Sequence, residues 1–213
     1  MRLALAFSLL SGPALACETA LMLAVDVSNS VDMAEYRLQI DGMADALSDP
    51  EVIDALVQGQ VAISVMQWSG VGRQEVSLPW SRVATRDDAL ALAIAARALP
   101  RAFVLSDTAV GDAVRAALPR FDAVADCRRR VLDISGDGPD NAGSDPRTAA
   151  GLAARAGVTI NAIAIEGMGR AVSSFFERAV ITPDGFVVTA RGHRDYPRAI
   201  RAKILREVSA ALF

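Results

Sequence analysis

The clearest sign of a functional site in the chain is the types and spacing of Asp26, Ser28 and Ser30. They form a D-x-S-x-S pattern directly after the apolar run 21–25. One carboxylate and two hydroxyls offer the hard oxygen ligands that a cation such as Mg²⁺ prefers. The same stretch also fits the start of a helix, with Ser30 or Asp32 as the N-cap residue. Taken alone, the pattern leaves a metal site and a helix cap both open.

The elements that would position these residues can be inferred from the apolar runs. The run 21–25 does not alternate with polar residues, which indicates a strand buried on both faces of a parallel sheet. A second such strand is expected at 131–135, and Asp137 follows it. If the two strands are neighbours, Asp26 and Asp137 lie at the same edge of the sheet, where ligands bind in such folds. Thr108 is expected at that edge too, because a helix follows it and a strand precedes Asp137.

Strand-like and helical segments alternate along the whole chain. Predicted strands lie at 21–25, 61–68, 75–80, 131–135, 158–165 and 186–189. Predicted helices begin near Asp32, Thr85, Thr108, Ser144, Ser173 and Tyr196. The order predicts an α/β fold, a doubly wound and mostly parallel sheet of about six strands with helices on both faces. An antiparallel edge strand is expected at 75–80, since a tight turn precedes it and Pro79 cannot donate to a ladder.

Composition limits the classes of function. The 213 residues are enough for one domain with a full core, and 52% hydrophobic with only 5% aromatic residues predicts a core of Ala, Val, Leu and Ile. A formal net charge of −3 gives no sign of a nucleic-acid partner. His193 is the only histidine, so a site with several histidines from one chain is excluded. Lys203 is the only lysine.

Residues 1–16 have the pattern of an export signal. Arg2 precedes the apolar stretch 3–10, and Ala14-Leu15-Ala16 is an A-x-A cleavage site. The segment is too short to span a membrane, and no later stretch approaches about 20 apolar residues. We therefore expect a signal peptide at 1–16, a single domain at 17–213, and a periplasmic or secreted protein. Cleavage would leave Cys17 first, so a lipoprotein anchored at Cys17 is the less favoured alternative.

Cys17 and Cys127 are the two cysteines of the chain, and each lies just ahead of a predicted strand. If those strands are parallel neighbours, both cysteines lie at one end and both aspartates, Asp26 and Asp137, at the other. An oxidising compartment would then allow a disulfide. Closing so long a loop would contribute roughly 4–5 kcal/mol in the chain-entropy model. The alternative is two unrelated thiols.

The polar residues at the expected sheet edge resemble a known pattern. In identity, order and spacing they match the metal-ion-dependent adhesion site (MIDAS) of the von Willebrand factor A (vWA) domain, with Asp26, Ser28, Ser30, Thr108 and Asp137 as the corresponding residues. The resemblance covers nearly all of 17–213. Three further segments resemble an exported bacterial branch of A-domain-like proteins, a domain of unknown function: Trp68-Ser69-Gly70, Pro79-Trp80 and Ser135-Gly136-Asp137-Gly138.

The resemblance implies a binding protein and no catalytic residues. The serine and threonine hydroxyls would bind Mg²⁺, with Mn²⁺ also fitting, and the aspartates would bind directly or through water. A protein partner would complete the shell with an acidic ligand. The chain departs from common A domains at 106–108, where Gly is more usual, and at 135–137, where Thr-Asp-Gly is commoner. Asp107, Asp140 and Asn141 are nearby polar residues that we leave outside the core site.

An enzyme is the rival interpretation. The chain also resembles Mg²⁺-dependent haloacid-dehalogenase phosphatases, in which a strand ends in a nucleophilic aspartate. Those enzymes need a general-acid aspartate two residues later, where this chain has Ser28, and a lysine before the last acidic loop, whereas none precedes Lys203. Serine hydrolysis is disfavoured because His193, beside Arg191 and Arg194, is predicted to be a surface residue.

Overall fold

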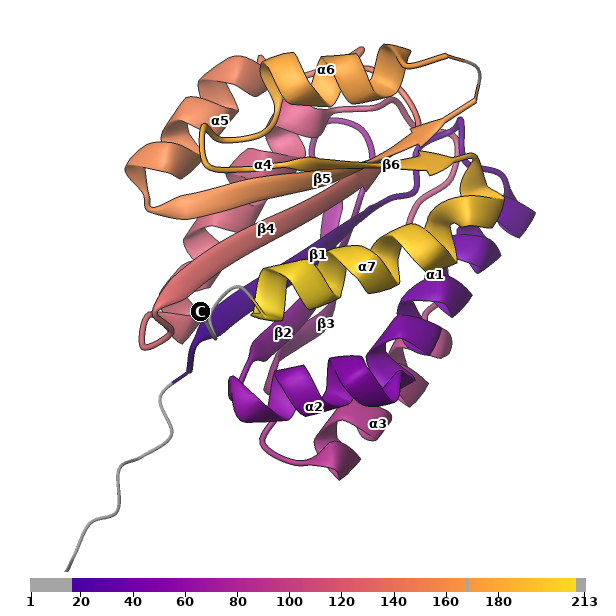
Figure 1. Cartoon of the computed structure of the whole chain (residues 1–213). Coiled ribbons are helices and arrows are strands. Elements are labelled where there is room, and N and C mark those ends of the chain that lie inside the picture. The colour runs from indigo at the N-terminus through magenta and orange to yellow at the C-terminus, as the bar shows by residue number, and fades with distance from the viewer. Residues whose placement is uncertain (1–16, 168, 210–213) are drawn as a thin grey trace, which may run out of the picture.

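The computed structural model describes residues 17–167 and 169–209 (Figure 1). The predicted signal segment 1–16 lies outside these residues. The strands are β1 (Thr19–Asp26), β2 (Ala62–Trp68), β3 (Gln74–Arg82), β4 (Arg129–Gly136), β5 (Val158–Glu166) and β6 (Val187–Arg191). The α-helices are α1 (Met33–Ser48), α2 (Pro50–Gln58), α3 (Arg86–Arg97), α4 (Val110–Ala117), α5 (Pro146–Arg155), α6 (Ala171–Ala179) and α7 (Tyr196–Ser209). Two 3₁₀ turns accompany them, η1 (Leu118–Val124) and η2 (His193–Asp195).

The strands form one six-stranded sheet in the order β3-β2-β1-β4-β5-β6. β1 pairs in parallel with both β2 and β4, while β3 pairs antiparallel with β2 at the edge. The predicted sheet, including its antiparallel edge strand, is therefore confirmed. The chain moves outward in one direction from β1 and in the other from β4, so the strand order reverses between these two strands. That reversal is the place where ligands bind in doubly wound sheets.

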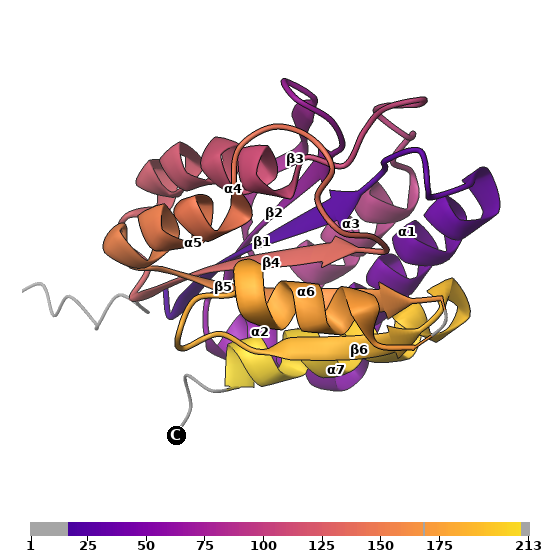
Figure 2. The same cartoon turned by 90° about the horizontal axis from the view of Figure 1, so that it is seen from above.

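Helices cover both faces of the sheet, and the core is split accordingly (Figures 1 and 2). On one face, α1, α2, α3 and α7 pack against side chains such as Leu21 and Leu23 of β1. On the other face, α4, α5 and α6 pack against their neighbours Ala20 and Met22. All eight residues of β1 are buried, which explains the absence of alternation in its sequence. None of the helices in the described segments is long and apolar enough to cross a membrane.

The ends of α1 and α5 are set by the local sequence. Asp32 caps α1: its carboxylate accepts a hydrogen bond from Glu35 N, and Glu35 Oε2 accepts one from Asp32 N, both at 2.8 Å. Asp145 caps α5 with Pro146 in the first turn, next to the predicted helix start at Ser144. Because Asp32 is the cap of α1, Ser30 is not needed for that role and remains in the loop with Asp26.

Cys17 and Cys127 form the predicted disulfide. They lie just before β1 and β4, where Arg128 N also donates a hydrogen bond to Cys17 O at 2.9 Å. The bond closes a loop with a sequence separation of 110 residues. Because its sulfur is bonded to Cys127, Cys17 has no thiol to carry a lipid, which argues against the lipoprotein alternative.

Lys203, the only lysine, lies in the core between α7 and the sheet. It is 0% exposed, and its Nζ is 2.6 Å from both Asp133 Oδ1 and Glu207 Oε1. Asn161 Nδ2 also donates to Glu207 Oε1, at 2.8 Å. Burial raises the pKa of Glu207 to about 7 and raises that of Asp133, although Lys203 opposes both shifts. The cluster ties α7 to β4 and β5, so the lysine has a structural role.

Candidate metal centre

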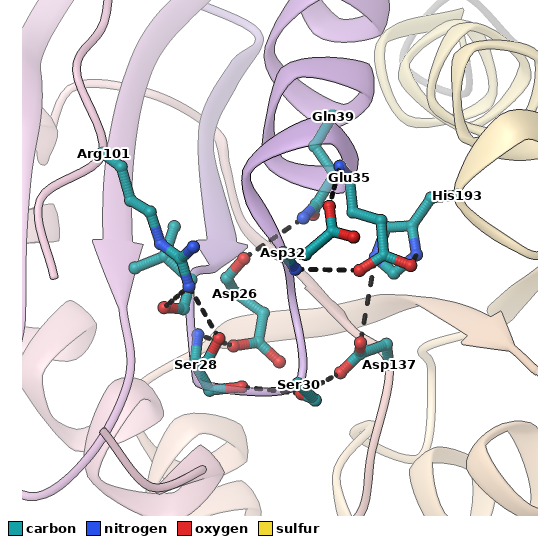
Figure 3. A network of polar contacts seen from close by, with 10 residues as sticks. Asp26, Ser28, Ser30, Asp32, Glu35, Gln39, Arg101, Asp137 and His193 are labelled. Carbon is teal, nitrogen blue, oxygen red and sulfur yellow. Dashed lines mark hydrogen bonds and ion pairs between the residues drawn. The ribbon is translucent and has the colours of Figure 1, made fainter. Parts of the chain in front are cut away.

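Four of the five predicted ligand residues are connected at the carboxyl end of β1 and β4 (Figure 3). In the Asp26 loop (residues 26–32), Asp26 Oδ1 accepts a hydrogen bond from Ser28 N at 2.7 Å. The hydroxyls of Ser28 and Ser30 are 3.1 Å apart, and Ser30 Oγ donates to Asp137 Oδ1 at 2.6 Å. The oxygens of Asp26, Ser28, Ser30 and Asp137 thus converge on one place although Asp137 is far away in sequence.

Asp26 is fully buried, and its Oδ2 has no hydrogen-bond partner among the described residues. Desolvation, followed by the charge of Asp137, raises the pKa of Asp26 to about 7. An unpartnered buried carboxylate oxygen is costly unless a cation neutralises it. A Cβ at Gly136 would lie 3.2 Å from this oxygen and 3.2 Å from Phe176 Cζ, so glycine keeps the space beside Asp26 open. The residues present therefore fit a divalent cation.

Thr108, the fifth predicted residue, is 6% exposed and lies in the Thr108 loop (residues 98–109). This loop touches the Asp26 loop through a hydrogen bond from Asn29 N to Ser106 O, 2.9 Å long. It also touches the Asp137 loop (residues 137–145): Thr108 N donates to Asn141 Oδ1, and Asn141 N donates to Thr108 O, both at 2.9 Å. The three loops that carry the predicted ligands are thus linked by hydrogen bonds.

Asp140 and Asn141 hold the Thr108 loop in place, a role that the sequence did not reveal. Asp140 Oδ1 accepts a hydrogen bond from Val110 N at 2.7 Å, while the formal N-cap of α4, Ala109, makes no side-chain cap. The helix begins close to Thr108, as predicted, but the side chain of Thr108 does not cap it. The capping carboxylate comes instead from the Asp137 loop, 30 residues further along the chain, and a local pattern cannot show such a contact.

Arg101 and Gln39 also hold the backbone of the Asp26 loop (Figure 3). Arg101 Nη2 donates to the carbonyl oxygens of Val27 and Ser28, both at 2.9 Å. Gln39 Nε2 donates to Asp26 O at 3.3 Å. Because these carbonyls are already engaged, the loop is held in a fixed conformation, as binding sites require.

The prediction that His193 is a surface residue is wrong, because this residue is only 8% exposed. Its Nδ1 is 3.2 Å from Glu35 Oε1, and its Nε2 is 3.9 Å from Asp137 Oδ2. The neighbours Arg191 and Arg194 are exposed, but the turn η2 after β6 carries His193 inward to the point where the strand order reverses. Sequence analysis therefore missed both His193 and Glu35, whose position in the first turn of α1 gives only a capping signal.

Several exposed apolar residues lie in or next to the loops that carry the predicted ligands. We define the apolar rim as four exposed residues in or next to the loops at this edge of the sheet: Met33, Val71, Val104 and Leu105. Met33 begins α1, Val71 lies in the turn between β2 and β3, and the other two lie in the Thr108 loop.

Leu105 is the most exposed residue of the apolar rim, at 84%. Its φ of +50° places a branched residue in the left-handed region, which costs on the order of 1–3 kcal/mol. The next residue is held firmly: Ser106 Oγ accepts a hydrogen bond from Gly70 N at 3.1 Å, and its carbonyl accepts from Asn29. Strain of this kind concentrates at binding and active sites.

A cavity of about 920 Å³ lies beyond the ends of β5 and β6. Its charged lining residues are Glu166, Arg170, Arg191, Asp195 and Arg198. Both carboxylates are engaged: Glu166 Oε1 accepts from Ser173 N at 2.7 Å, and Asp195 Oδ1 accepts from Arg198 Nε at 2.6 Å. The three arginines leave the lining with one positive charge in excess, although Arg198 pairs with Asp195 and Arg170 with Glu177.

Comparison with known proteins identifies the family and the fold. A family model described as "Protein of unknown function (DUF1194)" matches residues 16–212. No curated protein sequence matches the chain.

Several solved structures share the fold at low sequence identity. Proximal thread matrix protein 1 from the mussel byssus is 17% identical with a TM-score of 0.65, over 91% of this chain and 47% of that one. A second structure of it, "with zinc occupied MIDAS motif", has a TM-score of 0.62 at 17% identity, over 91% and 46%. BatB from Bacteroides thetaiotaomicron gives 0.59 at 16% identity, over 91% and 98%.

The pilus adhesin SpaC from Lactobacillus rhamnosus GG gives a TM-score of 0.65 at 14% identity, over 92% of this chain and 30% of that one. The chain thus spans about half the length of the mussel protein and less than a third of SpaC. These similarities show a vWA fold, as the sequence predicted.

Proposed function

The chain belongs to the DUF1194 family and has the vWA fold, and on this basis we propose that it binds a protein partner through a divalent cation. The proposed ligands are Asp26, Ser28, Ser30, Thr108 and Asp137. The observation that carries the proposal is the hydrogen-bonded chain of oxygens beside the buried and unpartnered Asp26 Oδ2.

The donor set determines the kind of cation. Two carboxylates and three neutral hydroxyls are hard ligands that suit Mg²⁺, which keeps some of its waters, and Mn²⁺ fits the same set. The cation would offset the repulsion between Asp26 and Asp137 that contributes to the raised pKa of Asp26. The zinc in the mussel structure belongs to that protein, but it supports metal binding on this fold.

The partner is proposed to supply a carboxylate to the cation. The lining of the nearby cavity has one positive charge in excess, and Arg191 in it is exposed, which is in keeping with an acidic partner. The apolar rim would add the desolvated contacts that stable interfaces need. The description of SpaC as a pilus adhesin concerns that protein, yet it is in keeping with a binding role.

A haloacid-dehalogenase-like phosphatase remains the disfavoured alternative. Lys203 would have to contact a phosphate, but it is buried between Asp133 and Glu207. His193 contacts Glu35 and Asp137, so it is not placed as the base of a serine nucleophile. These contacts favour a protein that is not an enzyme.

We also propose that the protein is exported, with a signal peptide at 1–16 and a single vWA-like domain at 17–213. The Cys17–Cys127 disulfide supports this, because such bonds persist in oxidising compartments. The periplasm or the extracellular space would provide that environment.

Metal binding is tested by calorimetric titration of the purified protein with Mg²⁺ and Mn²⁺, beside Asp26→Ala. We expect the wild type to bind one ion at this site and Asp26→Ala to bind none while keeping its circular dichroism spectrum. Equal binding by both proteins would refute the ligand assignment.

Partner binding is tested by affinity capture from an extract of the source cell's envelope, in Mg²⁺ and in EDTA. The matched control is the double variant Ser28→Ala/Ser30→Ala, which keeps the carboxylates and loses two hydroxyls. We expect capture only by the wild type in Mg²⁺. A complex that persists in EDTA would contradict a metal-mediated interface.

A further inference from the structure

We propose that Glu35, Asp137 and His193 form a second cation site that shares Asp137 with the first and binds Zn²⁺ or a similar transition metal. One ligand atom from each residue lies within 4.8 Å of the other two. Zn²⁺ forms bonds of about 2.0–2.2 Å to histidine nitrogen and carboxylate oxygen, so the three side chains would move closer together when they bind one ion.

The imidazole of His193 is the group that points to a ligand. Each ring nitrogen faces a carboxylate, Nδ1 that of Glu35 at 3.2 Å and Nε2 that of Asp137 at 3.9 Å (Figure 3). The second distance is too long for a hydrogen bond, and Nε2 has no partner within 17–167 and 169–209 although the side chain is only 8% exposed. A buried ring nitrogen without a partner is costly. A metal ion bound to Nε2 and Asp137 Oδ2 would satisfy it, with Glu35 Oε1 moving from Nδ1 to the same ion.

Asp137 connects the two sites because its two oxygens face different groups. Oδ1 accepts the hydrogen bond of Ser30, and Oδ2 lies toward His193. One carboxylate can therefore bridge two cations, as bridging carboxylates do in two-metal sites. The donors also differ in kind: the first site offers only oxygens, whereas the second adds an imidazole, which favours Zn²⁺ over Mg²⁺.

Ions can reach the second site from solvent. A pocket of about 360 Å³ is lined by Glu35 and His193, among other residues. Glu35 is also held in place, because its Oε2 accepts a hydrogen bond from Asp32 N at 2.8 Å. This hydrogen bond uses Oε2 and leaves Oε1, the oxygen nearest His193, available as a metal ligand.

The single histidine allows a test that needs no variant. The ring nitrogens of His193 give the only imidazole signals of the untagged chain in ¹H–¹⁵N NMR. We expect Zn²⁺ added to protein saturated with Mg²⁺ to shift one ring nitrogen strongly, while Mg²⁺ alone does not. Unchanged imidazole signals at saturating Zn²⁺ would overturn the proposal and leave a structural His193–carboxylate contact.

Variants separate this site from the first one. We expect His193→Gln and Glu35→Gln to weaken Zn²⁺ binding about tenfold or more and to keep Mg²⁺ binding, as measured by calorimetry. Asp26→Asn should weaken Mg²⁺ binding and keep Zn²⁺ binding. If both glutamine variants bind Zn²⁺ as tightly as the wild type, the second site is refuted. If the wild type does not bind Mg²⁺, only the first site is refuted.

Discussion

At the scale of single residues, Asp26 is a proposed metal ligand whose burial also destabilises the metal-free protein. Its carboxylate is fully buried, and the pKa is raised to about 7 by desolvation and by Asp137. Above that pH the group must be ionised without a partner for Oδ2 among the described residues. Proteins commonly retain such costs at sites that bind a ligand.

We predict that Asp26→Asn stabilises the metal-free protein while it abolishes Mg²⁺ binding. Asparagine keeps an oxygen that can accept the hydrogen bond from Ser28 N and removes the buried charge. Thermal unfolding at pH 8 in EDTA should show a higher Tm for the variant, and added Mg²⁺ should raise the Tm of the wild type only. A lower Tm in EDTA would mean that the charge is not a burden on the fold.

Glu207 predicts a pH dependence of stability. Burial raises its pKa from the ordinary value of 4.5 to about 7, so the folded state holds this proton more tightly than the unfolded chain. The contribution of Glu207 to stability is therefore fully present below pH 4.5 and is lost as the pH rises through 7, by on the order of 3 kcal/mol.

Glu207→Gln should remove this part of the pH dependence, because the amide keeps an oxygen for Asn161 and cannot ionise. Urea unfolding at pH 5 and pH 8 in EDTA measures the effect. Both proteins are compared on the Asp26→Asn background, since Asp26 titrates in the same range. If the free energy of unfolding decreases equally from pH 5 to pH 8 in both proteins, the assignment of the pH dependence to Glu207 is contradicted.

At the scale of the elements, the Thr108 loop depends on contacts from the Asp137 loop. Asp140 caps α4 through Val110 N, and Asn141 exchanges hydrogen bonds with the backbone of Thr108. The metal ligands are thus positioned by neighbouring loops as well as by their own strands.

We predict that Asp140→Ala lowers Mg²⁺ affinity about tenfold while it costs only about 1 kcal/mol of stability, the usual cost of losing a cap. The matched control is Asp145→Ala, which removes the cap of α5. This control should lose similar stability without a change in affinity. Calorimetry measures the Mg²⁺ affinity of both variants, and urea unfolding measures their stability. Equal Mg²⁺ affinities of the two variants would show that Asp140 does not position the metal ligands.

Local and long-range features differ in how far the sequence could predict them. The apolar run of β1 and the capping pattern of α1 depend on neighbouring residues, and both were predicted. The roles of Arg101, Asp140 and His193 depend on contacts between segments 30 or more residues apart. No spacing in the sequence indicates such contacts, and the exposed arginines beside His193 suggested the wrong environment.

At the scale of the whole molecule, the disulfide and the metal site lie at opposite ends of the same two strands. Cys17 and Cys127 precede β1 and β4, whereas Asp26 and Asp137 lie at their carboxyl ends. The fold therefore places the stabilising disulfide at one end of these strands and the proposed metal ligands at the other.

We predict that Cys17→Ser/Cys127→Ser lowers the free energy of unfolding by about 4 kcal/mol and leaves Mg²⁺ affinity unchanged at temperatures where the variant is folded. Denaturant unfolding and calorimetry on the same samples test both parts. A large loss of affinity in a folded variant would show that the two ends are coupled.

The most direct test of the central claim is anomalous diffraction from crystals grown in Mn²⁺ without a bound partner. A metal-binding vWA domain predicts a Mn²⁺ peak surrounded by its five proposed ligands: Asp26, Ser28, Ser30, Thr108 and Asp137. The peak should be lost in Asp26→Ala crystals. Well-ordered loops with no peak among these residues at millimolar Mn²⁺ would contradict the proposed metal site.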